Sequence, residues 1–583
     1  MAVKRSAKDS TNLVRNCSQT ASLARISSTW QRKIGALEHL EIKMTKLVSG
    51  LRMWAARNLS EQQKRQILDL ASLSFLPYKS RLLNEYARQH PAERFDAFGN
   101  IAADLDTLRG VLGDAGIDYA QLPTRTISRP VLVIAEEDVT RLIPRLQTLA
   151  ESGRWIIRAE LKVGFQVSIT NPRIKPLEIR RILCRTNHVA ASGLELSSAA
   201  EQIIIEPWER IGYGVERVDG SEHIPGTLHR KVLRRNTLLE YLTPAAWERA
   251  KQHPQHLVKS EFAHIYEVTE PVDIVYTWVD GDDPEWRKKQ QRALAELTGG
   301  EVNETAVSQS RYQSRDELKY SLRSVEYYAS WVNHIYLVTD GQVPEWLNTE
   351  HPKITVVDHR EIFSDPEVLP VFNSHAIESQ LHHITGLSNQ YLYMNDDILF
   401  MRPVEPSLFY TGNGMSKFFP SNAPLDVDEP SARDMPVLSA AKRNRSHIET
   451  QFDRTVTNKF KHTPHPQLKE VMEEFEAEHP ELFSKVAASR FRHPEDYSIP
   501  SALYHYVAYA KRRAVDSNAI RYAYLDIASE DAEQVLADLL KRRNLDVLCV
   551  NDTATDPEQV AVVDKLLRDF LETRFPVPSS FEK

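Results

Sequence analysis

Acidic side chains follow four short apolar runs of this chain. The runs are Asp273–Asp280 (DIVYTWVD), His334–Asp340 (HIYLVTD), Ile354–Asp358 (ITVVD) and Gln390–Asp397 (QYLYMNDD). One strand that ends in aspartate is commonplace, because aspartate also starts turns. Four such runs in one stretch of chain indicate a shared site. Carboxylate oxygens at a ligand-binding edge are typical of a divalent cation that is held together with phosphates.

The four runs have the composition of buried strands. Each is rich in β-branched and aromatic residues, and each is too short for a buried helix. Helical stretches separate some of them, which favours a parallel or mixed sheet wound with helices. Because open sheets of this kind bind ligands beyond the carboxyl ends of their strands, we expect the aspartates to gather at one edge, around Asn395, Asp396 and Asp397.

Two helices between these strands carry further polar residues. In SRDELKYSLRSVEYYASWV, Ser314 and Glu317 predict a capping box, and the face that carries Arg323 is typical of a solvated surface. A second helix is predicted from Ser374 in FNSHAIESQLHHITGL. It places His375, Glu378 and His382 on one face. That face could bind a metal or a substrate, or it could simply be exposed, and the spacing alone leaves both readings open.

Basic residues gather before the motif HTPHP, at His462 to Pro466. The residues are Lys442, Arg443, Arg445, Arg454, Lys459 and Lys461. A charge run of this kind is usually solvated surface. Its place between HTPHP and FRHPEDYS, at Phe491 to Ser498, makes an anion site the rival interpretation.

Length and composition limit the class of protein. A chain of 583 residues is too long for one core and predicts two to four domains. The net charge of −7 gives no support to a nucleic-acid binder. No apolar run approaches the ~20 residues that span a membrane. The cysteines Cys17, Cys184 and Cys549 lie far apart, which fits a reducing cytoplasm best.

Composition shifts divide the chain into five predicted parts. Residues 1–28 are rich in Ser, Thr, Arg and Lys and are interpreted as a mobile tail, with a transit peptide as the alternative. Residues 29–125 form a helical segment whose amphipathic faces pack within the protein or lie on a membrane. Residues 126–265 form a small α+β domain of unknown role. Residues 266–530 form the predicted catalytic domain. Residues 531–583 form a mainly helical extension, interrupted by the strand-like stretch LDVLCVND, that packs on it.

The ordered motifs resemble the Stealth family. DIVYTWVDGDDPEW, RYQSRDELKYSLRSVEYYASWVNHIYLVTDGQVPEWLN, FNSHAIESQLHHITGLSNQYLYMNDDILF, and KHTPHP with FRHPED look like its four regions. The family includes bacterial capsule and exopolysaccharide phosphotransferases and the animal lysosomal-enzyme GlcNAc-1-phosphotransferase. The match covers about Val272 to Tyr509, with a weaker tail.

The resemblance implies transfer of a sugar 1-phosphate from a nucleotide-sugar donor to a hydroxyl of a glycan acceptor. A phosphodiester forms and a nucleoside monophosphate leaves. It further implies a nucleotide-sugar-binding (GT-A-like) α/β fold, a mixed sheet with flanking helices, that uses Mg²⁺ or Mn²⁺. The predicted location is the cytoplasm, with peripheral association at the inner face of the membrane left open.

The resemblance also assigns roles to residues. Asp396 and Asp397 would bind the metal, because hard cations take carboxylate oxygen, and Asn395 would orient them. His462 would be the base for the acceptor hydroxyl, and Glu378 and Asp280 would assist, Asp280 by positioning. Arg492 would grip a phosphate with a fork of donors that lysine lacks. The remaining predicted substrate contacts are Arg311, Arg323, His375, His493 and Asp496.

Two other functions fit the same residues. An ordinary metal-dependent glycosyltransferase would also need a nucleotide-sugar edge and an aspartate pair, and it would release a nucleoside diphosphate. A non-catalytic glycan-binding scaffold would keep the fold without the chemistry, which the intact NDD, HTPHP and FRHPED motifs argue against.

Overall fold

The structure is a computed structural model of the chain. It describes residues 89–583 with gaps at 125, 163, 165, 173, 218–219, 231–238, 259–261, 297–313, 432, 553–554 and 557. The predicted tail, most of the predicted helical segment 29–125 and Arg311 therefore lie outside the described residues.

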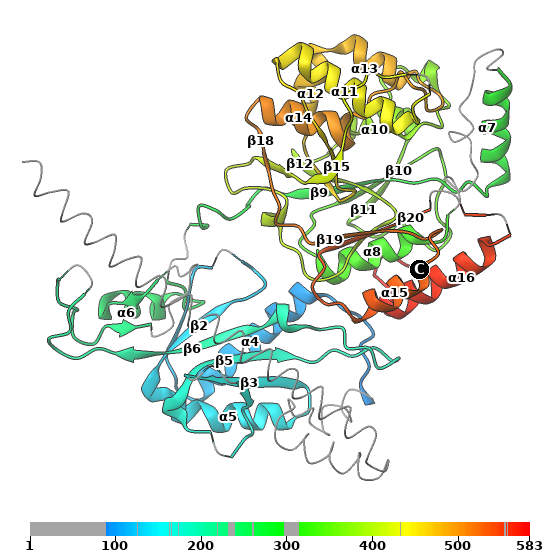
Figure 1. Ribbon diagram of the computed structural model, residues 1–583. Coiled ribbons are helices and arrows are strands. Elements are labelled where there is room, and N and C mark those ends of the chain that lie inside the picture. Colours follow the sequence, from blue (N-terminus) through cyan, green and yellow to red (C-terminus); the bar gives the residue numbers. More distant parts are fainter. Residues whose placement is uncertain are drawn as a thin grey trace, which may run out of the picture. The chain divides into compact units, whose positions relative to one another are not determined.

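A five-stranded mixed sheet forms the centre of the part of the chain that we predicted to be the catalytic domain (Figure 1). Its strands, in the order in which they lie side by side, are β11 (Ile354–Asp358), β10 (Ile335–Thr339), β9 (Val272–Thr277), β12 (Gln390–Asn395) and β17 (His465–Leu468). The first four are parallel, and β17 runs antiparallel to β12. The predicted mixed sheet and its four acid-ended strands are confirmed, and their carboxyl ends meet at one edge.

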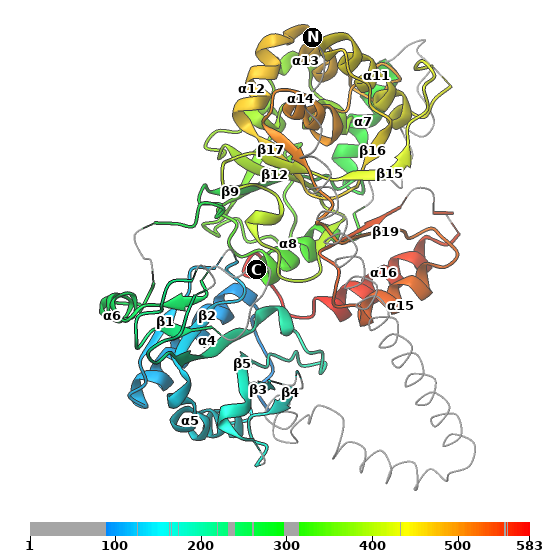
Figure 2. The same cartoon turned by 60° about the vertical axis from the view of Figure 1, so that its left-hand side comes forward.

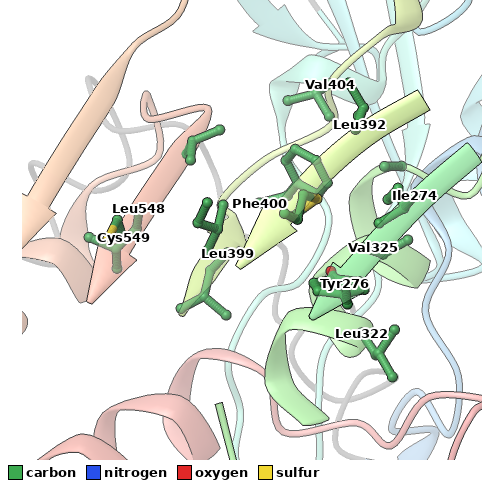
Figure 3. Close-up of a cluster of buried hydrophobic side chains, with 14 of the residues drawn as sticks. Ile274, Tyr276, Leu322, Val325, Leu392, Leu399, Phe400, Val404, Leu548 and Cys549 are labelled. Atoms are coloured by element: carbon green, nitrogen blue, oxygen red, sulfur yellow. The ribbon is translucent and has the colours of Figure 1, made fainter. Parts of the chain in front are cut away.

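Helices cover both faces of this sheet, as the continuously apolar strands require. On one face α8 (Glu317–Tyr328) packs Leu322 and Val325 into the core that also holds Ile274 of β9 and Leu392 of β12 (Figure 3). On the other face Val275 shares a core with Ala376 of the short helix α10 (Ser374–Glu378). Glu317, at the start of α8, is close enough to Asp396 and Asp397 at the carboxyl edge for their charges to interact.

The remaining helices of this part of the chain pack around the five-stranded sheet. Helices α11, α12, α13 and α14 lie together in both views (Figures 1 and 2). The helices of this part that have not yet been named are α7 (Pro284–Glu296), α9 (His359–Ile362), α11 (Pro436–Phe452), α12 (Lys469–Glu478), α13 (Pro480–Ala487) and α14 (Tyr504–Ala510). Short strands complete the domain: β13 (Ile398–Phe400), β14 (Ser416–Phe418), β15 (Pro420–Pro424), β16 (Asn458–Phe460) and β18 (Ala514–Asp516).

A three-stranded sheet joins the C-terminal region to the catalytic domain. In it β20 (Val547–Asn551) pairs parallel with β19 (Tyr522–Asp526) and antiparallel with β13. Helices α15 (Ala532–Lys541) and α16 (Val560–Arg574) pack beside these strands. The predicted strand in LDVLCVND is confirmed. The border that we predicted at residue 530 falls between β19 and β20, which are hydrogen-bonded to each other. Residues after 530 therefore share a sheet with strands that precede the border.

The N-terminal part of the described chain is built on an eight-stranded sheet. The strands are β1 (Tyr119–Gln121), β2 (Val131–Ala135), β3 (Trp155–Leu161), β4 (Gln166–Ser168), β5 (Ile179–Thr186), β6 (Ile203–Arg210), β7 (Leu228–His229) and β8 (Tyr241–Leu242). Helices α4 (Ala97–Asp114), α5 (Val139–Glu151) and α6 (Pro244–Gln252) accompany them. Because α4 packs into this core and β1 pairs with β2, the α+β domain begins well before the predicted border at 126.

Two local predictions are wrong. Ser314 does not cap α8. Asp316 precedes that helix in a left-handed conformation, and the carboxylate of Glu317 accepts from the backbone N–H of Arg315 at 2.6 Å. The helix predicted from Ser374 ends at Glu378, and a separate 3₁₀ turn, η7 (Leu381–His383), follows.

Among the described residues, no helix is both long and apolar enough to cross a membrane.

Candidate active site

Strand pairing brings His462 to the aspartate pair. Tyr393 of β12 lies opposite His465 of the antiparallel strand β17. The residues before His465 therefore extend past the carboxyl end of β12, where Asp397 follows. The Nε2 atom of His462 lies 3.7 Å from Oδ1 of Asp397. Two motifs that are distant in the sequence thus meet in one place.

A third segment reaches the same carboxylate. Ile398 of β13 pairs with Cys549 of β20, and the thiol of Cys549 donates to Oδ2 of Asp397 at 3.3 Å. Burial and the Asp397 carboxylate raise the pKa of this thiol well above its usual range. Cys549 is therefore a protonated hydrogen-bond donor that orients Asp397, and Figure 3 shows its strand beside Leu399.

Three carboxyl groups crowd together at this edge. Burial and the neighbouring carboxylates of Glu317 and Asp397 raise the pKa of Asp396 well above its ordinary value. Burial and Asp397 likewise raise the pKa of Glu317, although Arg315 opposes the shift. Like charges this close favour protonation or a bound cation. The edge is therefore arranged to bind positive charge.

The donor atoms fit a divalent cation. Oδ1 of Asp397 and Nε2 of His462 are buried, and neither has a hydrogen-bond partner in the described part of the chain. Atoms of Asp397, His462 and Cys549 lie within 4.8 Å of one another. Because hard cations prefer carboxylate oxygen, the aspartates are the natural ligands and the protonated thiol is not.

Glu378 and Arg492 also lie close enough to His462 for their charges to act on it. The Glu378 carboxylate is buried and accepts from the hydroxyl of Ser501 at 2.8 Å. Arg492 donates to the hydroxyl of Ser374, at the start of α10, at 2.7 Å. Burial lowers the pKa of His462, but the carboxylates of Asp397 and Glu378 outweigh it, so the pKa is raised even though Arg492 opposes them. The charges of Asp397, Glu378 and Arg492 therefore act together on the protonation of His462.

The FRHPED loop is fixed to α10 through Asp496. Its carboxylate accepts from Asn373 Nδ2 at 2.8 Å, from Ser489 Oγ at 2.6 Å and from the backbone N–H of His493 at 2.9 Å. Nδ1 of His375 lies 3.6 Å away. Burial raises the pKa of Asp496, but His375 and these hydrogen bonds outweigh it and lower the pKa. Asp496 and His375 therefore hold the loop that carries Arg492, and the His493 ring is exposed.

The other strand-end aspartates are engaged elsewhere. Asp280 accepts from the N–H of Asp282 at 2.9 Å, and its backbone binds Gln342. Asp340 pairs with Lys289 at 2.7 Å, and Asp358 caps α9. All three follow strands at the expected edge, but only Asp396 and Asp397 join the carboxyl cluster.

Arg323 lies in the packing between α8 and the C-terminal segment. It donates to both carboxylate oxygens of Glu582, at 2.8 and 2.6 Å, and to the carbonyl of Phe575 at 2.7 Å. The prediction of a solvated face here is wrong, since Arg323 is buried. The geometry favours a structural role over the predicted substrate contact.

Two residues of the basic run before HTPHP are structural, whereas Arg454 is exposed, as expected of a solvated surface. Lys442 is buried and pairs with Asp426 at 3.0 Å and Asp434 at 3.2 Å. Arg445 is buried and donates to the carbonyls of Asp426 and Asp428. These two residues hold the 426–434 loop, so they are neither a solvated surface nor open to an anion.

Two residues of the site escaped the sequence reasoning. Glu317 was interpreted as a helix cap, and Cys549 as one residue of a strand in the tail. Glu317 stands at the helix start in the quoted stretch SRDELKYSLRSVEYYASWV, so the family-like motif was the available signal for it, whereas Cys549 lies outside the quoted motifs. The long-range pairing of β13 with β20 had no local signal.

Comparison with protein families gives four ordered matches. Stealth protein conserved region 1 matches residues 270–298, region 2 matches 311–418, region 3 matches 461–509 and region 4 matches 537–583. Together they contain Asp280, Glu317, Glu378, the aspartate pair, His462, Arg492 and Cys549. The exopolysaccharide phosphotransferase SCO6023 of Streptomyces coelicolor is 38% identical in an alignment of 498 residues that covers 82% of each chain.

The chain belongs to the Stealth family of transferases. Other relatives match a smaller part of it. The exopolysaccharide phosphotransferase SCO2594 of Streptomyces coelicolor is 46% identical over 54% of this chain and 52% of its own length. The exopolysaccharide phosphotransferase CpsY of Mycobacterium tuberculosis is 37% identical over 62% of this chain and 66% of its own. The chain thus spans only about half to two thirds of these two Stealth relatives.

Among solved structures, similar chains include a galactosyltransferase, LgtC, and a bifunctional glycosyltransferase, WbbM. LgtC is 12% identical over 53% of this chain and 96% of its own, with a TM-score of 0.27. WbbM is 11% identical over 55% of this chain and 51% of its own, also with a TM-score of 0.27. At these scores the likeness supports no conclusion about this Stealth protein.

Proposed function

We propose that this Stealth protein transfers a sugar 1-phosphate from a nucleotide-sugar to a hydroxyl of an acceptor glycan, as a capsular or exopolysaccharide phosphotransferase. The observation that carries the proposal is the pairing of His462 with Asp397 at the carboxyl edge, beside Asp396. The relatives SCO6023 and CpsY, both named exopolysaccharide phosphotransferases, support the reaction class.

Asp396 and Asp397 would hold Mg²⁺ or Mn²⁺ at this edge. When bound, such an ion neutralises charge on the transferring phosphate oxygens and orients them. Oδ1 of Asp397 is buried, accepts no hydrogen bond from the described residues and lies 3.7 Å from Nε2 of His462, so it can take a cation as ligand, while the thiol of Cys549 donates to the other oxygen. Cys549 and Glu317 are therefore positioning residues in this proposal.

His462 would accept the proton of the acceptor hydroxyl. The acceptor oxygen attacks the phosphorus that carries the sugar, a P–O bond to the acceptor forms, and the P–O bond to the nucleotide breaks. A nucleoside monophosphate then leaves with the electron pair of that bond. Asp397 stabilises the imidazolium that His462 becomes, which agrees with its raised pKa.

Arg492 and Glu378 would organise the phosphate side of the site. One Nη of Arg492 is bonded to Ser374, and the rest of the guanidinium is proposed to bind a donor phosphate by a fork of N–H groups. Glu378 is buried between Ser501 and the hydroxyl of Tyr393, whose pKa burial and Glu378 raise well above its usual range. Glu378 thereby supplies a negative charge that favours the imidazolium form of His462.

Nucleotide release tests the proposal. The protein with Mg²⁺ is incubated with a panel of nucleotide-sugars and an acceptor glycan, and the released nucleotide is identified chromatographically. The proposal predicts a nucleoside monophosphate, absent with Asp397→Asn. Release of a nucleoside diphosphate would identify an ordinary glycosyltransferase instead. No turnover with any donor, together with unchanged glycan binding in Asp397→Asn, would favour the scaffold.

A further inference from the structure

A second cluster of metal-binding side chains lies away from the aspartate edge. It consists of His382 and His383, in the turn η7, and Glu476 of helix α12. Nε2 of each imidazole lies 2.7 Å from the same oxygen, Oε2 of Glu476. The two rings lie against each other, with centroids 4.1 Å apart. Two nitrogen donors and a carboxylate therefore converge on one point.

The hydrogen bonding of His383 fixes its tautomer. Its Nδ1 lies 2.8 Å from the carbonyl oxygen of Ile362, which can only accept, so Nδ1 carries a hydrogen. In a neutral ring, Nε2 then presents a lone pair to the carboxylate. Either a proton or a cation must lie between them. Histidines that bind metals commonly donate their other ring N–H to a carbonyl in this way.

We propose that His382, His383 and Glu476 bind a transition-metal ion of the zinc type, with a fourth coordination position open to solvent. Two imidazoles and a carboxylate are a ligand set that zinc uses, whereas Mg²⁺ prefers oxygen alone. The site is also accessible. The His382 side chain is fully buried, but His383 and Glu476 are 24% and 25% exposed.

The two nitrogen–oxygen distances require only a small adjustment, and all three ligand atoms lie within 4.8 Å of one another. Tetrahedral ligands about 2.0 to 2.1 Å from zinc lie roughly 3.3 Å from one another. The two nitrogens are 2.7 Å from Oε2, so the Glu476 side chain would withdraw by roughly 0.6 Å. Being partly exposed, that side chain has room to move. Glu473, one turn earlier on α12, contributes a further negative charge that both rings sense.

The place of this cluster in the fold gives the ion a structural role. The turn η7 follows Glu378 of α10 after two residues, and α12 follows directly on β17. One segment therefore leads to a proposed site carboxylate, and the other continues the strand that positions His462. An ion at His382, His383 and Glu476 would link the two segments and stiffen the support of both.

Cobalt titration of the full-length protein tests this site. The protein is freed of metal with a chelator, dialysed and titrated with Co²⁺, and Zn²⁺ is then added to displace it. A four-coordinate site with nitrogen donors gives strong visible absorption by Co²⁺, whereas a six-coordinate oxygen site, such as one at Asp396 and Asp397, gives weak absorption. We expect the strong absorption, and we expect Asp397→Asn to retain it.

Two variants and a matched control locate the ion. Glu476→Gln and His383→Gln should each weaken Zn²⁺ binding by at least about 100-fold, since outer partners alone contribute 10- to 100-fold. Glu478→Gln, on the same helix and paired with Lys511 at 2.8 Å, should bind as wild type. Zn²⁺ should raise the midpoint of thermal unfolding only where it binds.

The opposite results would overturn the proposal. If wild-type protein gives only weak Co²⁺ absorption, or if His383→Gln binds Zn²⁺ as tightly as wild type, the cluster is a protonated histidine–glutamate contact. Circular dichroism of each variant confirms folding. Should Glu476→Gln fail to fold, the wild-type spectrum and the partly exposed His383 variant decide the matter.

Discussion

Replacement of His462 by alanine probes the base in the proposed reaction. A general base contributes roughly 10²- to 10⁴-fold, which is about 3 to 5 kcal/mol of activation free energy. In the structure the partner charge of Asp397 lies 3.7 Å from Nε2. An opposite charge at this range contributes roughly 1 kcal/mol through water and roughly 4 kcal/mol near a protein surface.

Exposure decides which part of that range applies. The contacting atoms, Nε2 of His462 and Oδ1 of Asp397, are buried, but the His462 side chain as a whole is 37% exposed. Solvent therefore partly screens the charge of the ring, and we take the lower part of the range. We therefore expect His462→Ala to lower kcat by about 10²- to 10³-fold. Donor affinity, measured by calorimetry with a nucleotide-sugar, should stay near wild type. Because the lost ring was partly exposed, added imidazole should restore part of the activity.

The pH dependence of kcat is a further test of His462 as the base. Asp397 and Glu378 outweigh burial and raise the pKa of His462 above its ordinary 6.5. The neutral ring is the base, so wild-type kcat should rise with pH through that raised pKa. The rise should be absent in His462→Ala. If His462→Ala turned over as fast as the wild-type protein across about pH 6 to 9, His462 would not be the base.

Three further predictions follow from other parts of the molecule. Chelation by EDTA should abolish transfer and Mg²⁺ or Mn²⁺ should restore it; full activity in chelator would contradict the aspartate metal site. Arg492→Lys keeps the charge but loses the fork, so donor binding or kcat should fall about tenfold or more in steady-state assays; a silent change would make the FRHPED motif structural. Burial raises the pKa of Glu201 from 4.5 to about 7, although hydrogen bonds from Ser198 oppose the shift. Its protonated form therefore stabilises the fold below about pH 4.5, and this contribution, about 3 kcal/mol, is lost as pH rises to about 7. Urea unfolding of Glu201→Gln should lack that loss, and parallel pH profiles of the two proteins would contradict it.

The sheet could be predicted because its signals are local. The β-branched runs of β9 to β12 specify strands, and parallel pairing then brings Asp280, Asp340, Asp358 and Asp396 to one edge. The role of each aspartate could not be predicted in this way. Asp340 binds Lys289 and Asp358 caps α9, and such partner choices depend on tertiary neighbours that strand patterns do not encode.

Residues placed by long-range contacts were the ones missed or misassigned. Cys549 reaches Asp397 only because β20 pairs with β13. His382 was expected beside His375 and Glu378 on one helix face. Because α10 ends at Glu378, the chain turns His382 toward Glu476 instead. A periodicity argument holds only as far as the helix continues.

The bond that breaks in the donor tests the central claim most directly. A nucleotide-sugar with radioactive label in the phosphate next to the sugar is incubated with the protein, Mg²⁺ and an acceptor glycan. If His462 and the aspartate edge direct attack at phosphorus, the label moves into the glycan as a phosphodiester and the released nucleotide is unlabelled. If the label stays in a released nucleoside diphosphate while sugar enters the glycan, attack occurs at the anomeric carbon and the account is wrong.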